Sequence, residues 1–125
     1  MATPIIIKAG DVILEGELND SPTARAIAAA LPIRTQGNRW GEEIYFEIPI
    51  DAQLEENARQ VVDAGDIAYW PTGRAFCLFF GPTPASQGDE IRAASPVNVI
   101  GRITGDYIRL VDVADNAFVS IEPNG

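Results

Sequence analysis

The sequence has 125 residues, which fits a single domain, 1–125, with its own hydrophobic core. Its 18 acidic residues outnumber the 9 lysines and arginines, and a net charge of −9 argues against nucleic acid and anionic membrane surfaces as partners. There is no histidine and only one cysteine. This excludes Ser-His-Asp and Cys-His catalytic sites, a disulfide framework and a thiolate metal cluster, so we expect no metal and no other cofactor.

Two further absences concern location. No basic start followed by an apolar stretch marks a secretory leader, and no apolar run approaches the length of a membrane span. We therefore expect a cytoplasmic protein.

The first elements in chain order are a hairpin and a helix. Pro4–Lys8 and Val12–Leu18 read as two strands joined by a short turn. Asp20 or Ser21 can cap a helix over Thr23–Leu31, which a proline ends. Four apolar side chains give this helix one buried face: Ala26, Ile27, Ala30 and Leu31.

An alternating strand follows over Glu42–Ile48, after an extended stretch and a turn at Asn38–Gly41. Ile44, Phe46 and Ile48 fall on one side and predict its core face. Extending the alternation places Trp40 and Glu42 on that same apolar side. The opposite side is expected to be exposed, and it carries Glu43, Tyr45 and Glu47.

A second hairpin is predicted in the aromatic stretch Gly65–Pro84. The apolar runs Ile67–Trp70 and Ala75–Phe80 flank Pro71–Arg74, which has the composition of a tight turn. After the long connection Gly81–Pro96, three last strands are predicted: Val97–Ile103, Tyr107–Val113 and Phe118–Glu122. Several short strands with regular turn signals and one helix indicate a mainly β protein with a closed or nearly closed barrel.

Four separated motifs carry a resemblance to a family. Trp40–Phe46, Gly65–Pro71, Cys77–Pro84 and Ala94–Gly101 together resemble the small cyclophilin-like proteins of bacteria and archaea. The resemblance runs from about Ile5 to Ile103. It implies a closed eight-stranded cyclophilin-like barrel with one or two short helices, and it implies no assigned activity. The Phe-His-Arg-Val-Ile and Phe-Met-Ile-Gln-Gly-Gly segments of the cyclophilin isomerases do not occur in this sequence.

The aromatic residues supply the candidate walls of a binding site. Aromatic rings give large, rigid contact area for a peptide or small molecule. Trp40 and Trp70 lie near strand ends, where a cleft could open. Their expected partners in the wall are Tyr69 and Phe79, whereas Phe76, Leu78 and Phe80 are expected to be core.

The polar candidates are few. Glu42 could bind a cationic or amide-bearing ligand, or bridge to an arginine; Arg74 could orient the ligand from the hairpin turn, and Asn98 could hydrogen-bond an extended one. Cys77 lies inside an apolar strand and is expected to be an inert small hydrophobe.

Three functions remain open at this point. The first is a binding domain that takes a peptide segment or small polar ligand in an aromatic-lined cleft without strong catalysis. The second is an atypical peptidyl-prolyl isomerase, in which Arg74, or Arg34 or Arg92, would stabilise the twisted amide. The third is a structural domain that forms a homodimer through the strand of Tyr45.

Overall fold

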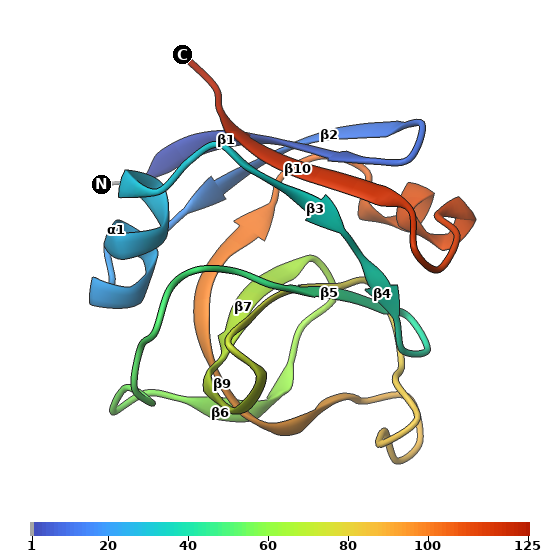
Figure 1. Ribbon diagram of the computed structural model, residues 1–125. Coiled ribbons are helices and arrows are strands. Elements are labelled where there is room, and N and C mark those ends of the chain that lie inside the picture. Colours follow the sequence, from blue (N-terminus) through green and yellow to red (C-terminus); the bar gives the residue numbers. More distant parts are fainter. Residues whose placement is uncertain (1) are drawn as a thin grey trace.

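The computed structural model describes residues 2–125 and confirms a mainly β protein with one α-helix. Figure 1 shows the strands wrapped around a central core, with the helix at one end. The elements in chain order are β1 (Thr3–Ala9), β2 (Val12–Leu18), α1 (Pro22–Ala29), β3 (Ile33–Gln36), β4 (Asn38–Arg39), β5 (Glu43–Glu47), β6 (Arg59–Val62), β7 (Asp66–Trp70), η1 (Pro71–Gly73), β8 (Ala75–Phe79), β9 (Ile91–Ile103), η2 (Tyr107–Asp112) and β10 (Phe118–Pro123), where η1 and η2 are 3₁₀ helices.

Local sequence explains the first elements. Gly10 takes φ 57° in the β1–β2 turn, a conformation that glycine adopts without steric cost. The Ser21 hydroxyl accepts a hydrogen bond from the Ala24 amide at 3.3 Å and caps α1, so Ser21 is the cap of the two that the sequence offered. The predicted strand Tyr107–Val113 is wrong: most of it forms η2, which lies against β2.

The strands form one antiparallel sheet in the order β3-β10-β1-β2-β9-β7-β8-β5-β4, with β6 added beside β9. The prediction of a closed eight-stranded barrel is wrong in two respects. Within residues 2–125 the sheet has ten strands, and its end strands β3 and β4 do not pair with each other. They are consecutive in the chain, so the covalent backbone, not a hydrogen-bond ladder, joins the two ends of the sheet (Figure 1).

Gly37 makes this junction between β3 and β4. Its amide donates to the Ala117 carbonyl, and its carbonyl accepts from the Asn116 amide, both at 2.9 Å. A Cβ at this position would lie 2.9 Å from a methyl of Val119 and 3.0 Å from a methyl of Ile44. A side chain at the junction would therefore require these neighbouring side chains to shift.

The sheet encloses a main core and carries a second core on the outer face of β5, β7 and β8. Phe46 and Phe76 stack in the main core with ring centroids 5.2 Å apart. Strand β9 is long and curved, and its first half, paired with β6, covers the outer face (Figure 1). All five residues of β8 are consequently buried. The second core consists of Val62, Ala68, Ala75, Cys77, Phe79, Ile91, Ala93 and Val97.

Candidate functional site

A pocket of about 220 Å³ opens at the edge of the second core, and we call it the aromatic pocket. Strand register brings its floor together: Tyr45 of β5 lies opposite Cys77 of β8, and Trp70 of β7 lies opposite Ala75 of β8. Side chains two residues apart on a strand share a face, so Glu43 joins Tyr45 there. The lining is Trp40, Glu43, Tyr45, Trp70, Cys77, Ala93, Ala94 and Val97.

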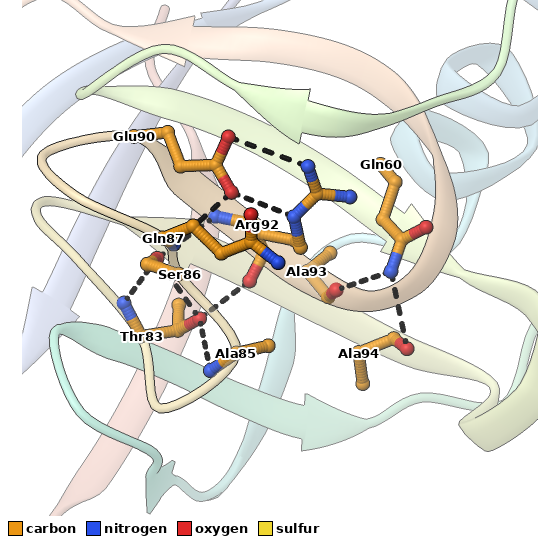
Figure 2. Close-up of polar contacts among 9 residues, drawn as sticks. All are labelled: Gln60, Thr83, Ala85, Ser86, Gln87, Glu90, Arg92, Ala93 and Ala94. Atoms are coloured by element: carbon orange, nitrogen blue, oxygen red, sulfur yellow. Dashed lines mark hydrogen bonds and ion pairs between the residues drawn. The ribbon is translucent and has the colours of Figure 1, made fainter.

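A bulge in β9 makes the far wall of the pocket. The paired residues Arg59 and Val61 are two positions apart on β6, whereas their partners Val97 and Arg92 are five positions apart on β9. The intervening segment 93–96 therefore leaves the ladder. The Gln60 amide fills the gap by donating to the carbonyls of Ala93 at 3.0 Å and Ala94 at 3.4 Å (Figure 2).

The loop before β9 holds the start of this wall (Figure 2). The Thr83 hydroxyl donates to the Arg92 carbonyl, and the Ser86 hydroxyl accepts from the Arg92 amide at 3.1 Å. The Arg92 guanidinium donates to Glu90 at 2.6 Å, and this bond lowers the pKa of Glu90. The Arg92 guanidinium is thus paired with the carboxylate of Glu90, which lies just before β9.

Trp70 is fixed from two sides. Its indole N–H donates to the Ser95 hydroxyl at 2.6 Å, which ties β7 to the β9 bulge. Its ring meets Tyr45 edge-on, with centroids 6.4 Å apart and planes at 84°. Two partly buried rings in the pocket lining therefore stand at about a right angle to each other.

Glu43 is the unusual residue of the pocket. It is only 5% exposed, and burial raises the pKa of its carboxyl from 4.5 to about 7. The neighbouring Cys77 thiol lowers this pKa only in part. No ion pair within residues 2–125 includes Glu43. The pocket thus contains a carboxyl that changes charge near neutral pH.

Cys77 is fully buried beside this carboxyl. Burial raises the pKa of the thiol well above its usual value, and the neighbouring Glu43 raises it further. The thiol therefore stays protonated and donates to the Ala75 carbonyl at 3.8 Å, in accord with the expectation that Cys77 is not a nucleophile.

Of the residues that the sequence singled out, the structure brings Trp40 and Trp70 together in the aromatic pocket. Glu42 lies outside it, because its side chain packs over Gly81, where a Cβ would collide with the carboxyl. Tyr69 and Phe79 do not line the pocket, and both are fully buried. The expectation that they form walls is wrong because β9 and the segment after β5 cover both faces of this part of the sheet.

Tyr69 and Asn98 hold the same covering segment, residues 50–55. The Tyr69 hydroxyl donates to the Ile50 carbonyl at 2.6 Å and accepts from the Ala52 amide at 3.2 Å. The Asn98 side chain donates to the Gln53 carbonyl at 2.9 Å and accepts from the Glu55 amide at 2.8 Å. Asn98 is only 2% exposed and already has these partners, so its position gives it a structural role.

Arg74 lies at the surface, in a left-handed conformation that ends η1. It pairs with Glu47 at 3.0 Å and lines a shallow surface hollow with Thr35, Ile48 and Pro49, apart from the aromatic pocket. The expected partnership of Arg74 with the aromatic walls is therefore not what the structure shows.

Sequence reasoning missed Glu43 and Tyr45 because it took their side of β5 to be exposed. The structure buries Glu43 and partly buries Tyr45 under β9. A usable signal was present in the run Ala75–Phe80, which is apolar at every position. Such a run is typical of a strand buried on both faces, and the second face of a neighbouring strand is then covered as well.

Other hollows carry less chemistry. One of about 390 Å³ beside Asn19 includes Asp66, whose pKa burial raises, but Asp66 already accepts from the Asp63 amide and lies 3.8 Å from Arg59. In the described part of the chain, no group of three acidic or cysteine side chains gathers as a metal site. No helix of residues 2–125 is long and apolar enough to cross a membrane.

The fold and pocket define a compact cyclophilin-like β domain with a small aromatic pocket. The family model of cyclophilin-like proteins matches residues 3–122, and the chain belongs to this family. It is also similar to the solution structure of the hypothetical protein AF2241 from Archaeoglobus fulgidus, with a TM-score of 0.84 and 46% identity over 98% of this chain and 95% of that one. The comparison with curated proteins finds no match.

Proposed function

We propose that this chain is a binding domain whose site is the aromatic pocket. The observation that carries the proposal is the buried Glu43 carboxyl, which lies among aromatic rings and has no cationic partner within residues 2–125. Burying an ionisable group without a counter-ion destabilises a fold, and an apolar side chain would fill the same place at lower cost. A ligand that binds the Glu43 carboxyl would account for its presence in the pocket.

The size of the pocket limits the ligand. Pockets for drug-sized molecules typically measure about 300–1,000 Å³, and this one measures about 220 Å³. The ligand class is therefore a small polar molecule, or one side chain of a bound peptide segment. Trp40, Tyr45 and Trp70 would supply contact area, and Glu43 would orient the ligand.

Catalysis of prolyl isomerisation through Arg74 has little support, because Arg74 pairs with Glu47 away from the pocket. Homodimerisation through Tyr45 has little support either, because Tyr45 packs against Trp70 inside the pocket.

The test is an NMR titration of ¹⁵N-labelled protein with a set of small polar fragments and a short Ala-Pro peptide. We expect shifts at the two tryptophan indoles and at the β9 bulge, lost in Trp40→Ala. The matched control is Phe118→Ala, which removes a ring that is 76% exposed and outside the pocket lining. Equal responses from the wild type, Trp40→Ala and Phe118→Ala would reject the site. Accelerated cis–trans exchange of the peptide would instead favour the isomerase.

A further inference from the structure

We infer that the aromatic pocket selects a compact ammonium group, which the Glu43 carboxylate pairs with and the rings of Trp40, Tyr45 and Trp70 surround. This inference rests on the proposed binding function and names the chemistry of its ligand. Four features of the molecule support it: the counter-ions near Glu43, the rings, the hydrogen-bond donors and the net charge of the chain.

Within the described part of the chain, Glu43 has no cation paired with it. Arg92 is held by Glu90 at 2.6 Å, and Arg74 by Glu47 at 3.0 Å. The Arg39 guanidinium, although close in sequence, lies 5.1 Å over the Phe80 ring and donates to three backbone carbonyls, those of Gly41, Val111 and Val113. Each of these guanidinium groups has other partners. The counter-ion of Glu43 would therefore come from a ligand.

The rings suit a cation. The faces of tryptophan and tyrosine attract ammonium groups within about 6 Å of the ring centroid, and tryptophan is the strongest. Tyr45 and Trp70 stand at 84° to each other, and Trp40 comes from the separate turn before β5. A group of aromatic rings around one site is the arrangement that recognises quaternary ammonium groups in general.

Two hydrogen-bond donors of the pocket are already in use. The Trp70 indole N–H donates to Ser95, and the Cys77 thiol donates to the Ala75 carbonyl. Among residues 2–125, no lysine or arginine lines the pocket. An anionic ligand would therefore meet a carboxylate without any cation to bind it, whereas an ammonium group brings the positive charge that this lining needs.

The charge of the chain and the titration of Glu43 point the same way. The net charge of −9 draws cations toward the surface. The titratable groups facing the Glu43 carboxyl are Tyr45 from β5 and Cys77 from β8; β7 and the β9 bulge contribute only Trp70 and apolar side chains to the lining. Since burial raises the pKa of Glu43 to about 7, an ammonium ligand must displace a proton at lower pH.

The experiment compares choline with its uncharged carbon isostere, 3,3-dimethylbutan-1-ol, by calorimetry at pH 6 and pH 8. For choline we expect affinity about tenfold higher at pH 8, because the ionised fraction of Glu43 rises by that factor. Repeating the titration at pH 6 in buffers of different ionisation enthalpy should show release of close to one proton. At pH 8 the isostere should bind more weakly than choline. At pH 6 its binding should release no proton.

Two variants separate the carboxyl from the pocket. Glu43→Gln keeps the shape and should remove both the preference for choline and the proton release. Glu47→Gln changes an exposed carboxyl of the same strand, outside the pocket lining, and should leave both unchanged. The ammonium assignment would be overturned if Glu43→Gln still bound choline better than the isostere. It would also be overturned if the wild type preferred choline equally at pH 6 and pH 8.

The outcomes also separate this inference from the proposed function. If polar fragments bind in the pocket and choline does not, the ammonium assignment fails and the binding site stands. If neither fragments nor choline bind, both fail. A third arm of the experiment uses N-acetyl-lysine methylamide and its trimethylated form. Tighter binding of these than of choline identifies a lysine side chain as the source of the ammonium group. Tighter binding of choline identifies a free small molecule.

Discussion

The replacement Glu43→Gln should stabilise this protein, and more so as the pH rises. In the unfolded chain the carboxyl titrates near its ordinary value of 4.5, whereas in the folded chain its pKa is about 7. Between these values the folded state keeps a proton that the unfolded state has released. The free energy of unfolding therefore falls as pH rises through this window, and glutamine, which does not ionise, abolishes that fall.

The size of the effect follows from the width of the window. The interval from 4.5 to about 7 corresponds to about 3 kcal/mol, at ~1.4 kcal/mol for each pH unit. Below pH 4.5 both states hold the proton, so the carboxyl costs nothing there. Above pH 7 both have released it, and the whole penalty of about 3 kcal/mol is present. Glu43 is 5% exposed, so solvent screening reduces this figure little.

Urea unfolding followed by tryptophan fluorescence at pH 4.5, 6, 7 and 8.5 measures the difference between variant and wild type. With a slope of about 2 kcal/mol per molar urea, the midpoint difference should grow by roughly 1.5 M across this series. Only the difference is informative, because other carboxyls contribute to the wild-type profile: burial raises the pKa of Asp66, and the Ser120 hydroxyl helps to lower that of Glu122. Glu47→Gln is the control, because it removes an exposed carboxyl of the same strand.

Parallel midpoints for the wild type and Glu43→Gln at all four pH values would refute the reasoning. That result would mean that the Glu43 carboxyl titrates in the folded protein as it does in water. It would also remove the physical reason for assigning a ligand to this residue.

Three further predictions concern the fold around the pocket. Asn98→Ala should cost about 2 kcal/mol in urea unfolding, because it removes the hydrogen bonds of Asn98 to Gln53, Glu55 and Thr23. Ligand titrations of the folded variant should match the wild type. Gly37→Ala should cost about 1–3 kcal/mol in the same assay, because the added methyl meets the side chains of Val119 and Ile44. The control is Gly88→Ala, where the added Cβ meets nothing within 4 Å. This control should cost about 1 kcal/mol, from the positive φ of Gly88 alone. Cys77 should not react with a thiol reagent at pH 8 until urea unfolds the chain, because it is buried and its pKa is raised; rapid reaction of the native protein would contradict its burial.

Most of the fold could be predicted from local patterns. The first hairpin, the capped helix and the aromatic hairpin follow from alternation, capping residues and turn residues, which act over a few positions. The segment Tyr107–Val113 could not, because a short apolar segment interrupted by Arg109 and Asp112 does not distinguish a strand from a packed 3₁₀ helix. Closure could not be predicted either, since it depends on whether β3 pairs with β4 or merely continues into it through Gly37.

The kinds of residue in the candidate site could be predicted from the sequence, but not all of the individual residues that form it. The sequence identified Trp40 and Trp70 by their places at strand ends, and both line the pocket. It also pointed to a carboxyl of the pair at positions 42 and 43, but favoured Glu42. The reason lies in long-range structure: the bulged first half of β9 covers the second face of β5, and a strand's own alternation reports which residues share a face, never what covers that face.

Stability and recognition are linked at Glu43. A buried polar group that serves the fold is satisfied by the fold, as Asn98 is through partners on two other segments. Glu43 differs, because within residues 2–125 its carboxyl forms no ion pair, and its ionisation opposes folding. A bound ammonium group would return stability that ionisation removes, so the rise in unfolding temperature that choline produces should be larger at pH 8 than at pH 6. A hydrophobic ligand bound only to the rings would produce the same rise at both.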